Sequence, residues 1–155
     1  SSQKVQANIA LSQKIGALPA GLMDNDEAAY RDQVVYRVRR DGWQLHNLTK
    51  DMRGDRGVVA HAVRKHGWAL QFATAEMRAD REIAVEAVRQ FGRALALVSD
   101  TLRADREVAL EAVRQDGTAL EFVSKELQAD REVVLEAVRQ NGMALPLASE
   151  ELRKD

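Results

Sequence analysis

The chain contains no cysteine, which excludes disulfide bridges, cysteine nucleophiles and thiolate metal ligands. It also lacks a run of about 18 apolar residues and a basic-then-apolar start, so neither a membrane-spanning helix nor a signal peptide is expected. An excess of one charge is missing too, because 23 basic residues face 24 acidic ones. No overall electrostatic field therefore attracts nucleic acid or an anionic membrane.

What is present is typical of a soluble globular domain. Apolar residues make up 45% of the 155 residues and charged residues 30%, a balance that disordered chains do not have. The length fits one compact domain with a hydrophobic core. We therefore expect a soluble domain, for which the sequence indicates no particular cellular location.

A period of 25 residues runs through most of the chain, and such internal repeats decide the fold class before any local feature does. Glycines recur at this step, and a leucine follows three residues after each: Gly42, Gly67, Gly92, Gly117 and Gly142, then Leu45, Leu70, Leu95, Leu120 and Leu145. Rows of aspartate, arginine and valine keep the same step. A further copy would begin at Asp155, which suggests a segment of a larger protein.

One unit, residues 105–129, predicts two helices. Asp105 is a good N-cap, because its carboxylate accepts hydrogen bonds from the free amides of the next turn. We expect Gly117 to end this first helix in the left-handed conformation. A shorter helix is expected over 118–128, with a break near Ser124, whose hydroxyl can cap or turn the chain. The first helix carries an apolar stripe of helical period at Val108, Ala109, Ala112 and Val113.

Neither helix can bury its apolar face alone, so neighbouring units are expected to stack into one continuous core. The predicted fold is an all-α solenoid of about five two-helix repeats over residues 30–155. Residues 1–29 fit the period poorly. We expect them to form a degenerate N-terminal capping unit, because terminal repeats are often atypical.

The last repeat resembles a known family. It reads Asp130-Arg131-Glu132-Val133-Val134-Leu135 and continues to Asn141-Gly142-Met143-Ala144-Leu145. This pattern resembles the tandem repeats called domain of unknown function 4116. The resemblance covers about residues 30–155, with departures in the first units such as Tyr30 and Gly57. It implies all-helical repeats in larger, mostly bacterial or protist proteins, and it implies no catalytic residue.

Motifs for catalysis or metal binding are missing from the sequence. His61 and His66 are five residues apart, which misses the i, i+4 spacing that turns two imidazoles toward one metal. Asp24-Asn25-Asp26 resembles the start of a calcium loop, but Ala29 replaces the required glycine and helix capping explains these residues better. The acidic residues recur every 25 positions, whereas a catalytic site is expected once. We therefore expect no enzyme activity, no metal and no cofactor.

Two rows of arginines suggest two different roles. The first follows the capping aspartates, at the helix end whose dipole disfavours a cation, and we predict that it bonds acidic or carbonyl groups of an adjacent repeat. The second row lies late in the same helices. It is either a basic ladder for phosphate or an acidic partner, or a solvated face, and nearby glutamates three residues earlier favour the latter. The rows are Arg56, Arg81, Arg106 and Arg131, and Arg39, Arg64, Arg89, Arg114 and Arg139, with Glu86, Glu111 and Glu136.

Positions that do not repeat, at the turn between the two helices, are where binding specificity is expected. The chain's two tryptophans, Trp43 and Trp68, occupy equivalent positions in adjacent units, and aromatic anchors are common at binding hot spots. The alternative, which stays equally open, is that they fill space against the irregular N-terminal unit. The predicted partner-binding residues are Trp43, His46, His66, Trp68, Phe91 and Arg93.

The sequence thus predicts a scaffold or spacer that binds another protein and has no catalysis of its own. One alternative is a non-catalytic targeting segment of a larger secreted enzyme or effector. A weaker alternative is nucleic-acid binding along the second arginine row, which predicts a steep loss of affinity with salt. The partner's identity stays open. We expect a monomer or a weak end-to-end dimer, and no membrane partner.

Overall fold

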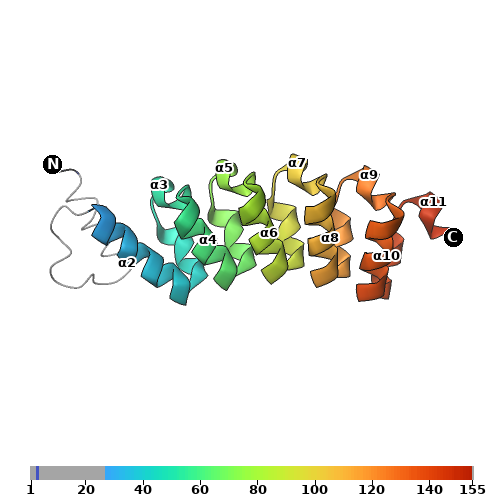
Figure 1. Ribbon diagram of the computed structural model, residues 1–155, viewed down its shortest axis with the longest axis horizontal. Helices are drawn as coiled ribbons and strands as arrows, with labels where there is room; N and C mark the ends of the chain where they lie inside the picture. Colours follow the sequence, from blue (N-terminus) through green and yellow to red (C-terminus); the bar gives the residue numbers. More distant parts are fainter. Residues whose placement is uncertain (1–2, 4–26, 155) are drawn as a thin grey trace.

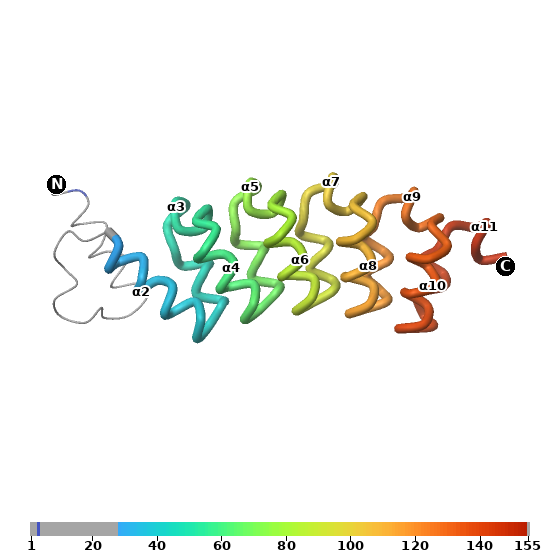
Figure 2. The backbone as a smooth tube through the Cα atoms, viewed as in Figure 1, coloured from blue at the N-terminus to red at the C-terminus, as the bar shows by residue number. Residues whose placement is uncertain are grey.

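A computed structural model describes residue 3 and residues 27–154 of the chain. All regular elements among these residues are helices, and they follow one another in a single elongated row (Figure 1 and Figure 2). This confirms the predicted all-α solenoid. The predicted capping unit, residues 1–29, lies outside the described residues except for residue 3 and residues 27–29, and these last three belong to the first helix of the row.

Each 25-residue repeat contains a long α-helix, a six-residue 3-10 helix and a one-turn α-helix, and we number repeats 1 to 5 from residue 30. The long helices are α2 (Glu27–Arg40), α4 (Arg56–Lys65), α6 (Arg81–Gln90), α8 (Arg106–Gln115) and α10 (Arg131–Gln140). The 3-10 helices are η1 (Gly42–Asn47), η2 (Gly67–Phe72), η3 (Gly92–Leu97), η4 (Gly117–Phe122) and η5 (Gly142–Leu147). The short helices are α3 (Lys50–Arg53), α5 (Ala75–Arg78), α7 (Asp100–Arg103), α9 (Lys125–Gln128) and α11 (Glu150–Arg153).

The aspartate row caps the long helices, as predicted. Oδ1 of Asp105 accepts hydrogen bonds from the amides of Glu107 and Val108 at 3.0 and 3.1 Å. Asp80 accepts in the same way from Ile83 at 3.0 Å. Each cap satisfies amides that have no partner inside the helix, and so the start of every long helix from α4 onwards is determined by one local residue.

The glycine row has a different role from the one predicted. α8 ends next to Asp116, which is extended (φ −147°, ψ 110°), and Gly117 is the first residue of η4. The predicted left-handed conformation of Gly117 is therefore wrong. A Cβ on Gly92 would lie 2.5 Å from the carbonyl oxygen of Ala112 in the next repeat. Glycine is needed because the 3-10 helix of one repeat touches the long helix of the next.

The second predicted helix is divided at the Ser/Thr position, as expected. The Oγ of Ser124 accepts from the amide of Leu127 at 3.3 Å and caps α9. The amide of Ser124 donates to the carbonyl of Arg103 in the preceding repeat at 3.0 Å. Because Thr74, Ser99 and Ser149 make the same backbone bond to the preceding repeat, the break also ties neighbouring repeats together.

The core is a continuous apolar layer that each repeat completes for the one before it. The leucines of the 3-10 helices are fully buried at Leu45, Leu70, Leu95 and Leu120. In the last described repeat, Leu145 is 42% exposed and Met143 80% exposed. Apart from the hydroxyl-bearing Tyr30, the buried side chains in residues 27–154 are apolar, so apolar packing between repeats, rather than an internal polar network, holds the stack.

Candidate functional site

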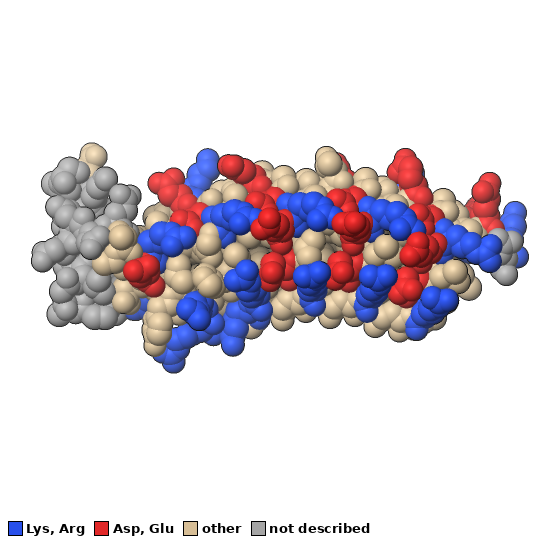
Figure 3. Space-filling model, in the orientation of Figure 1, with Lys and Arg blue, Asp and Glu red and all other residues tan. Residues whose placement is uncertain are grey.

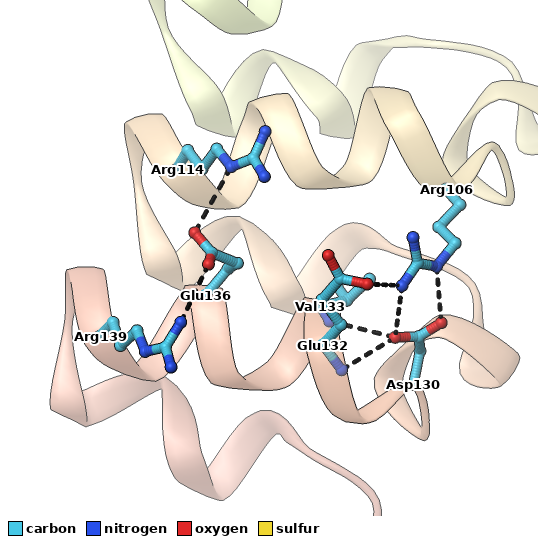
Figure 4. Close-up of polar contacts among 7 residues, drawn as sticks. All are labelled: Arg106, Arg114, Asp130, Glu132, Val133, Glu136 and Arg139. Carbon is cyan, nitrogen blue, oxygen red and sulfur yellow. Dashed lines mark hydrogen bonds and ion pairs between the residues drawn. The ribbon is translucent and has the colours of Figure 1, made fainter.

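The first arginine row bonds acidic groups of the adjacent repeat, as predicted. The Nε of Arg106 donates to the Oδ2 of Asp130 at 2.9 Å, and its Nη2 pairs with Glu132 (Figure 4). Figure 3 shows this row as alternating basic and acidic side chains along one face. The same two contacts join Arg56 to Asp80 and Glu82, and Arg81 to Asp105 and Glu107.

These contacts lower the pKa of the capping aspartates. At Asp130 the main cause is the hydrogen bond from Arg106, and at Asp55 it is the bond from Arg31 on α2. At Asp105, partial burial raises the pKa, but the bonds from Arg81 and from the amide of Val108 outweigh it. Each carboxylate therefore accepts from its own helix and from the preceding repeat, so the same residue caps a helix and links two repeats.

The second arginine row also pairs across repeats. The Nε of Arg89 donates to Glu111, 22 residues later, at 2.9 Å, and Arg64 and Arg114 make the equivalent pairs with Glu86 and Glu136. Among the described arginines of this second row, the expected pairing with the glutamate three residues earlier is present only between Arg139 and Glu136, at 3.2 Å (Figure 4). Stacking of the long helices places each glutamate beside the arginine of the preceding repeat. These pairs put negative charge along the row.

The first arginine of the second row, Arg39, lacks the glutamate partner that later arginines have. His61 occupies the position that Glu86, Glu111 and Glu136 hold in later repeats, so Arg39 faces an imidazole instead of a carboxylate. Partial burial lowers the pKa of His61, and the charges of Arg39, Arg64 and Arg31 lower it further. His61 is consequently driven toward its neutral form, and it adds no negative charge beside Arg39.

The tryptophans lie at a pocket formed by three adjacent repeats. Trp43 stacks on His66 of the next repeat, with ring centroids 5.6 Å apart and an interplanar angle of 30°. Trp68 packs edge-on against Phe91 of the next repeat, at 5.5 Å and 79°. A cavity of about 380 Å³ is lined by Trp43, His66, Gly67, Trp68, Gln90, Phe91 and Arg93. Five of the six predicted partner-binding residues therefore share one pocket.

The sixth residue, His46, lies outside this lining. Its ring is 5.3 Å from that of Phe72, and its Nδ1 is in hydrogen-bonding contact with the carbonyl of Trp43. Trp43 also packs edge-on against Phe72 at 6.0 Å. His46 thus supports the backbone and aromatic neighbours of Trp43 without facing the cavity.

Arg93 forms the far end of the pocket and is held by the fourth repeat. Its Nη1 donates to the Oγ1 of Thr118 at 2.9 Å, and its Nη2 lies 3.5 Å from Glu121. Its guanidinium carbon lies 4.9 Å from the centre of the Phe122 ring. The pocket wall is therefore fixed by contacts to the next repeat, and Thr118 and Glu121 occupy positions that vary between repeats, as Arg93 does.

The sequence interpretation missed Gln90 as a pocket residue. Its Oε1 accepts from the amide of Gly67 in the preceding repeat at 2.6 Å, and Gln115 and Gln140 do the same for Gly92 and Gly117. The sequence does mark this position as structural, because glutamine recurs two residues before the glycine in three successive repeats. Its role depends on a contact 23 residues away, which no local pattern reveals.

The histidines and acidic residues of the described chain form no group of three that would bind a metal ion. Within the same residues no helix has the length and apolar character needed to cross a membrane.

The fold, the 25-residue period and the ladder of contacts between repeats define an all-α repeat solenoid. The chain belongs to the family described as Domain of unknown function (DUF4116), which matches residues 55–103, 80–128 and 105–153. The three overlapping segments each span two adjacent repeats. Comparison with curated proteins and with solved structures found no match.

Proposed function

We propose that this chain is an interaction scaffold which binds another protein at the pocket between Trp43 and Arg93, without catalysis of its own. The single observation that carries this proposal is the convergence of five non-repeating residues on one cavity. Most other conspicuous polar residues have a structural partner in the next repeat, as Arg106 has in Asp130 and Arg89 in Glu111. Residues that the stack does not require are the ones free to serve recognition.

The chemistry of the pocket fits a protein side chain. Trp43 is 39% exposed, so part of its ring is available to a partner, while its contacts with His66 and Phe72 hold it in place. Rigid aromatic rings around a small cavity are typical of the anchor points at protein interfaces. Nucleic-acid binding along the second arginine row is less well supported. Its arginines pair with glutamates, whose negative charge would repel a phosphate backbone.

A quantitative pull-down from a lysate of the source organism tests the proposal. The double variant Trp43→Ala/Trp68→Ala should lose most of the captured partner, whereas Met143→Ala, a change at the equivalent position of the last repeat, should retain it. Circular dichroism melts of both variants confirm that each is folded. Equal recovery of the same partner by wild type and the double variant would contradict the proposal.

A further inference from the structure

Positive charge is concentrated at the ends of the first two long helices. The last turn of α2 carries Arg37, Arg39 and Arg40, and that of α4 carries Arg64 and Lys65. The last turns of α6, α8 and α10 carry one arginine each. A helix C-terminus favours a cation, but one residue satisfies that preference in three of the five helices. The additional cations call for another explanation.

Three of these cations have no acidic partner among the residues that the structure describes. Arg39, Arg40 and Lys65 are exposed, and none of the three forms an ion pair with any residue that the structure describes. We call these three residues the basic cluster. Figure 3 shows basic side chains gathered without acidic ones near the end of α2, in contrast to the alternating charges of later repeats. His61 is part of the reason, because it replaces the glutamate that would face Arg39.

Lys65 replaces a residue that forms a hydrogen bond between repeats elsewhere in the stack. The equivalent residue in the three later repeats is a glutamine whose Oε1 accepts from the amide of a glycine in the preceding repeat. A lysine side chain has no acceptor, so Lys65 cannot make this bond to Gly42. The substitution gives up a contact between repeats and places an ammonium group in solvent.

Two residues of the basic cluster lie close in the chain to the aromatic pocket. Arg40 and Lys65 each precede a pocket tryptophan, Trp43 or Trp68, by three residues. The pocket itself is lined mainly by rings, and its size is at the lower end of the range that takes small ligands. One large side chain therefore fits it, with neighbouring groups of the same partner reaching the basic cluster.

We propose that the partner bound at this pocket is an acidic peptide segment carrying one aromatic or large aliphatic side chain. The apolar side chain enters the cavity between Trp43 and Phe91, and aspartates or glutamates on either side meet the basic cluster. The inference rests on the proposed function, since it names the chemistry of that same site. Attraction between opposite charges raises the encounter rate and selects against basic partners.

A peptide is favoured over a nucleic acid by the short extent of the cluster. Past α4, the arginines at the ends of the long helices pair with Glu111 and Glu136, so a phosphate backbone following the solenoid would meet carboxylates. Three cations without a carboxylate partner, at one end of the described repeats, suit a short acidic segment, whereas nucleic-acid affinity grows with a longer series of phosphate contacts.

Selection from a displayed library of random 12-residue peptides tests the inference. Wild type should enrich peptides in which Asp and Glu flank a Phe, Trp, Tyr or Leu. A synthetic enriched peptide without tryptophan is then titrated against the chain, and the fluorescence of Trp43 and Trp68, the two tryptophans present, reports binding. Affinity should fall at least about fivefold between 50 and 500 mM salt.

Three variants separate the contribution of the basic cluster from that of the pocket. Arg39→Gln/Arg40→Gln/Lys65→Gln should weaken the peptide about tenfold, and Phe91→Ala should weaken it at least as much. Arg139→Gln, which removes a cation from the same turn of α10, should leave the affinity within about twofold. Binding of oligothymidylate or phosphatidylserine vesicles, measured in parallel, should be weaker than that of the peptide and unaffected by Phe91→Ala.

Each other result overturns the inference. Enriched peptides that need Phe91 but are neutral or basic would leave the proposed function standing and remove the acidic partner. Acidic peptides whose affinity is unchanged by the triple substitution would also leave the proposed function standing and contradict the role of the basic cluster. Failure to enrich any peptide would also overturn the inference, while the pull-down with Trp43→Ala/Trp68→Ala would still decide the proposed function independently. Tighter binding of oligothymidylate than of any peptide would assign the basic cluster to nucleic acid instead.

Discussion

Arg106 and Asp130, 24 residues apart in the chain, are joined by a hydrogen bond of 2.9 Å between the arginine Nε and the aspartate Oδ2. Asp130 accepts at the same time from the amides of Glu132 and Val133 at the start of α10. A residue that caps a helix is therefore also the docking point for the preceding repeat. Arg31 with Asp55, Arg56 with Asp80 and Arg81 with Asp105 repeat the arrangement, so the ladder spans repeats 1 to 5.

Removal of one rung of this ladder should weaken the stack. We expect Arg106→Ala to lower the melting temperature by roughly 1–4 °C, a modest effect because the guanidinium is exposed and exposed ion pairs contribute little. Lys125→Ala, which removes an exposed cation of the same repeat that forms no ion pair among the described residues, should leave the melting temperature unchanged. Differential scanning calorimetry measures both. Identical melting curves for wild type and Arg106→Ala would show that these contacts do not hold the repeats together.

Acid should destabilise the protein through the same aspartates. Their pKa in the folded state lies below the usual 3.8, so the ionised form stabilises the fold fully above that value. This stability is lost as the pH falls through the lowered pKa. The melting temperature should accordingly decrease between about pH 4 and pH 2.

Asp130→Asn is the matched variant for the acid dependence, because asparagine is also a good N-cap but does not titrate. Its melting temperature should be lower than that of wild type at pH 7 and should approach it at pH 2. A difference that stays constant from pH 7 to pH 2 would argue against the role of the ionised carboxylate.

Two equivalent glycines should respond very differently to alanine. A Cβ at Gly92 would lie 2.5 Å from the carbonyl oxygen of Ala112 and 2.8 Å from Oε1 of Gln115, whereas a Cβ at Gly142 meets nothing within 4 Å. We expect Gly92→Ala to reduce the free energy of unfolding by about 2 kcal/mol or more. Gly142→Ala should change it by less than about 1 kcal/mol. Urea denaturation provides both values, and similar losses at the two positions would mean that close packing is not what the glycine row serves.

His61→Glu should supply the missing carboxylate partner for Arg39 in the second arginine row. The glutamate would face Arg39 as Glu86 faces Arg64, so we expect a small rise in melting temperature at pH 7. In wild type the lowered pKa of His61 means that stability is present above the ordinary value of 6.5 and declines as the pH falls below it. The variant should lack this decline.

His61→Gln is the control, because it removes the titration without supplying a carboxylate. It should flatten the dependence on pH without raising the melting temperature at pH 7. His61→Glu should also weaken the selected acidic peptide, since it adds negative charge beside Arg39. A peptide affinity that rises in His61→Glu would contradict the proposed electrostatic role of the basic cluster.

The features that depend on neighbouring residues were predictable from the sequence. Asp105 reaches amides two and three residues away, and Ser124 caps the helix that begins at the next residue. Both hydrogen bonds join residues close together in the chain, and the same capping residues recur in successive repeats of the sequence. The period itself defines the solenoid, because helices with one apolar face must stack on their neighbours. The likeness to the DUF4116 family follows from the same residues.

Apart from the pairing of the first arginine row, the contacts between repeats were decided only by the tertiary structure. Gly117 was expected to end a helix by its own conformation, but it is required by the next repeat. Glu111 pairs with Arg89 on the long helix of the preceding repeat rather than with a residue of its own helix. The pocket has the same origin, since Trp43, Trp68 and Arg93 meet only once three repeats are stacked. Sequence alone determined the repeating unit and which residues depart from it. The way in which neighbouring repeats stack determined which residues touch across about one repeat length. Those contacts depend on how two helical layers pack and not on any local preference.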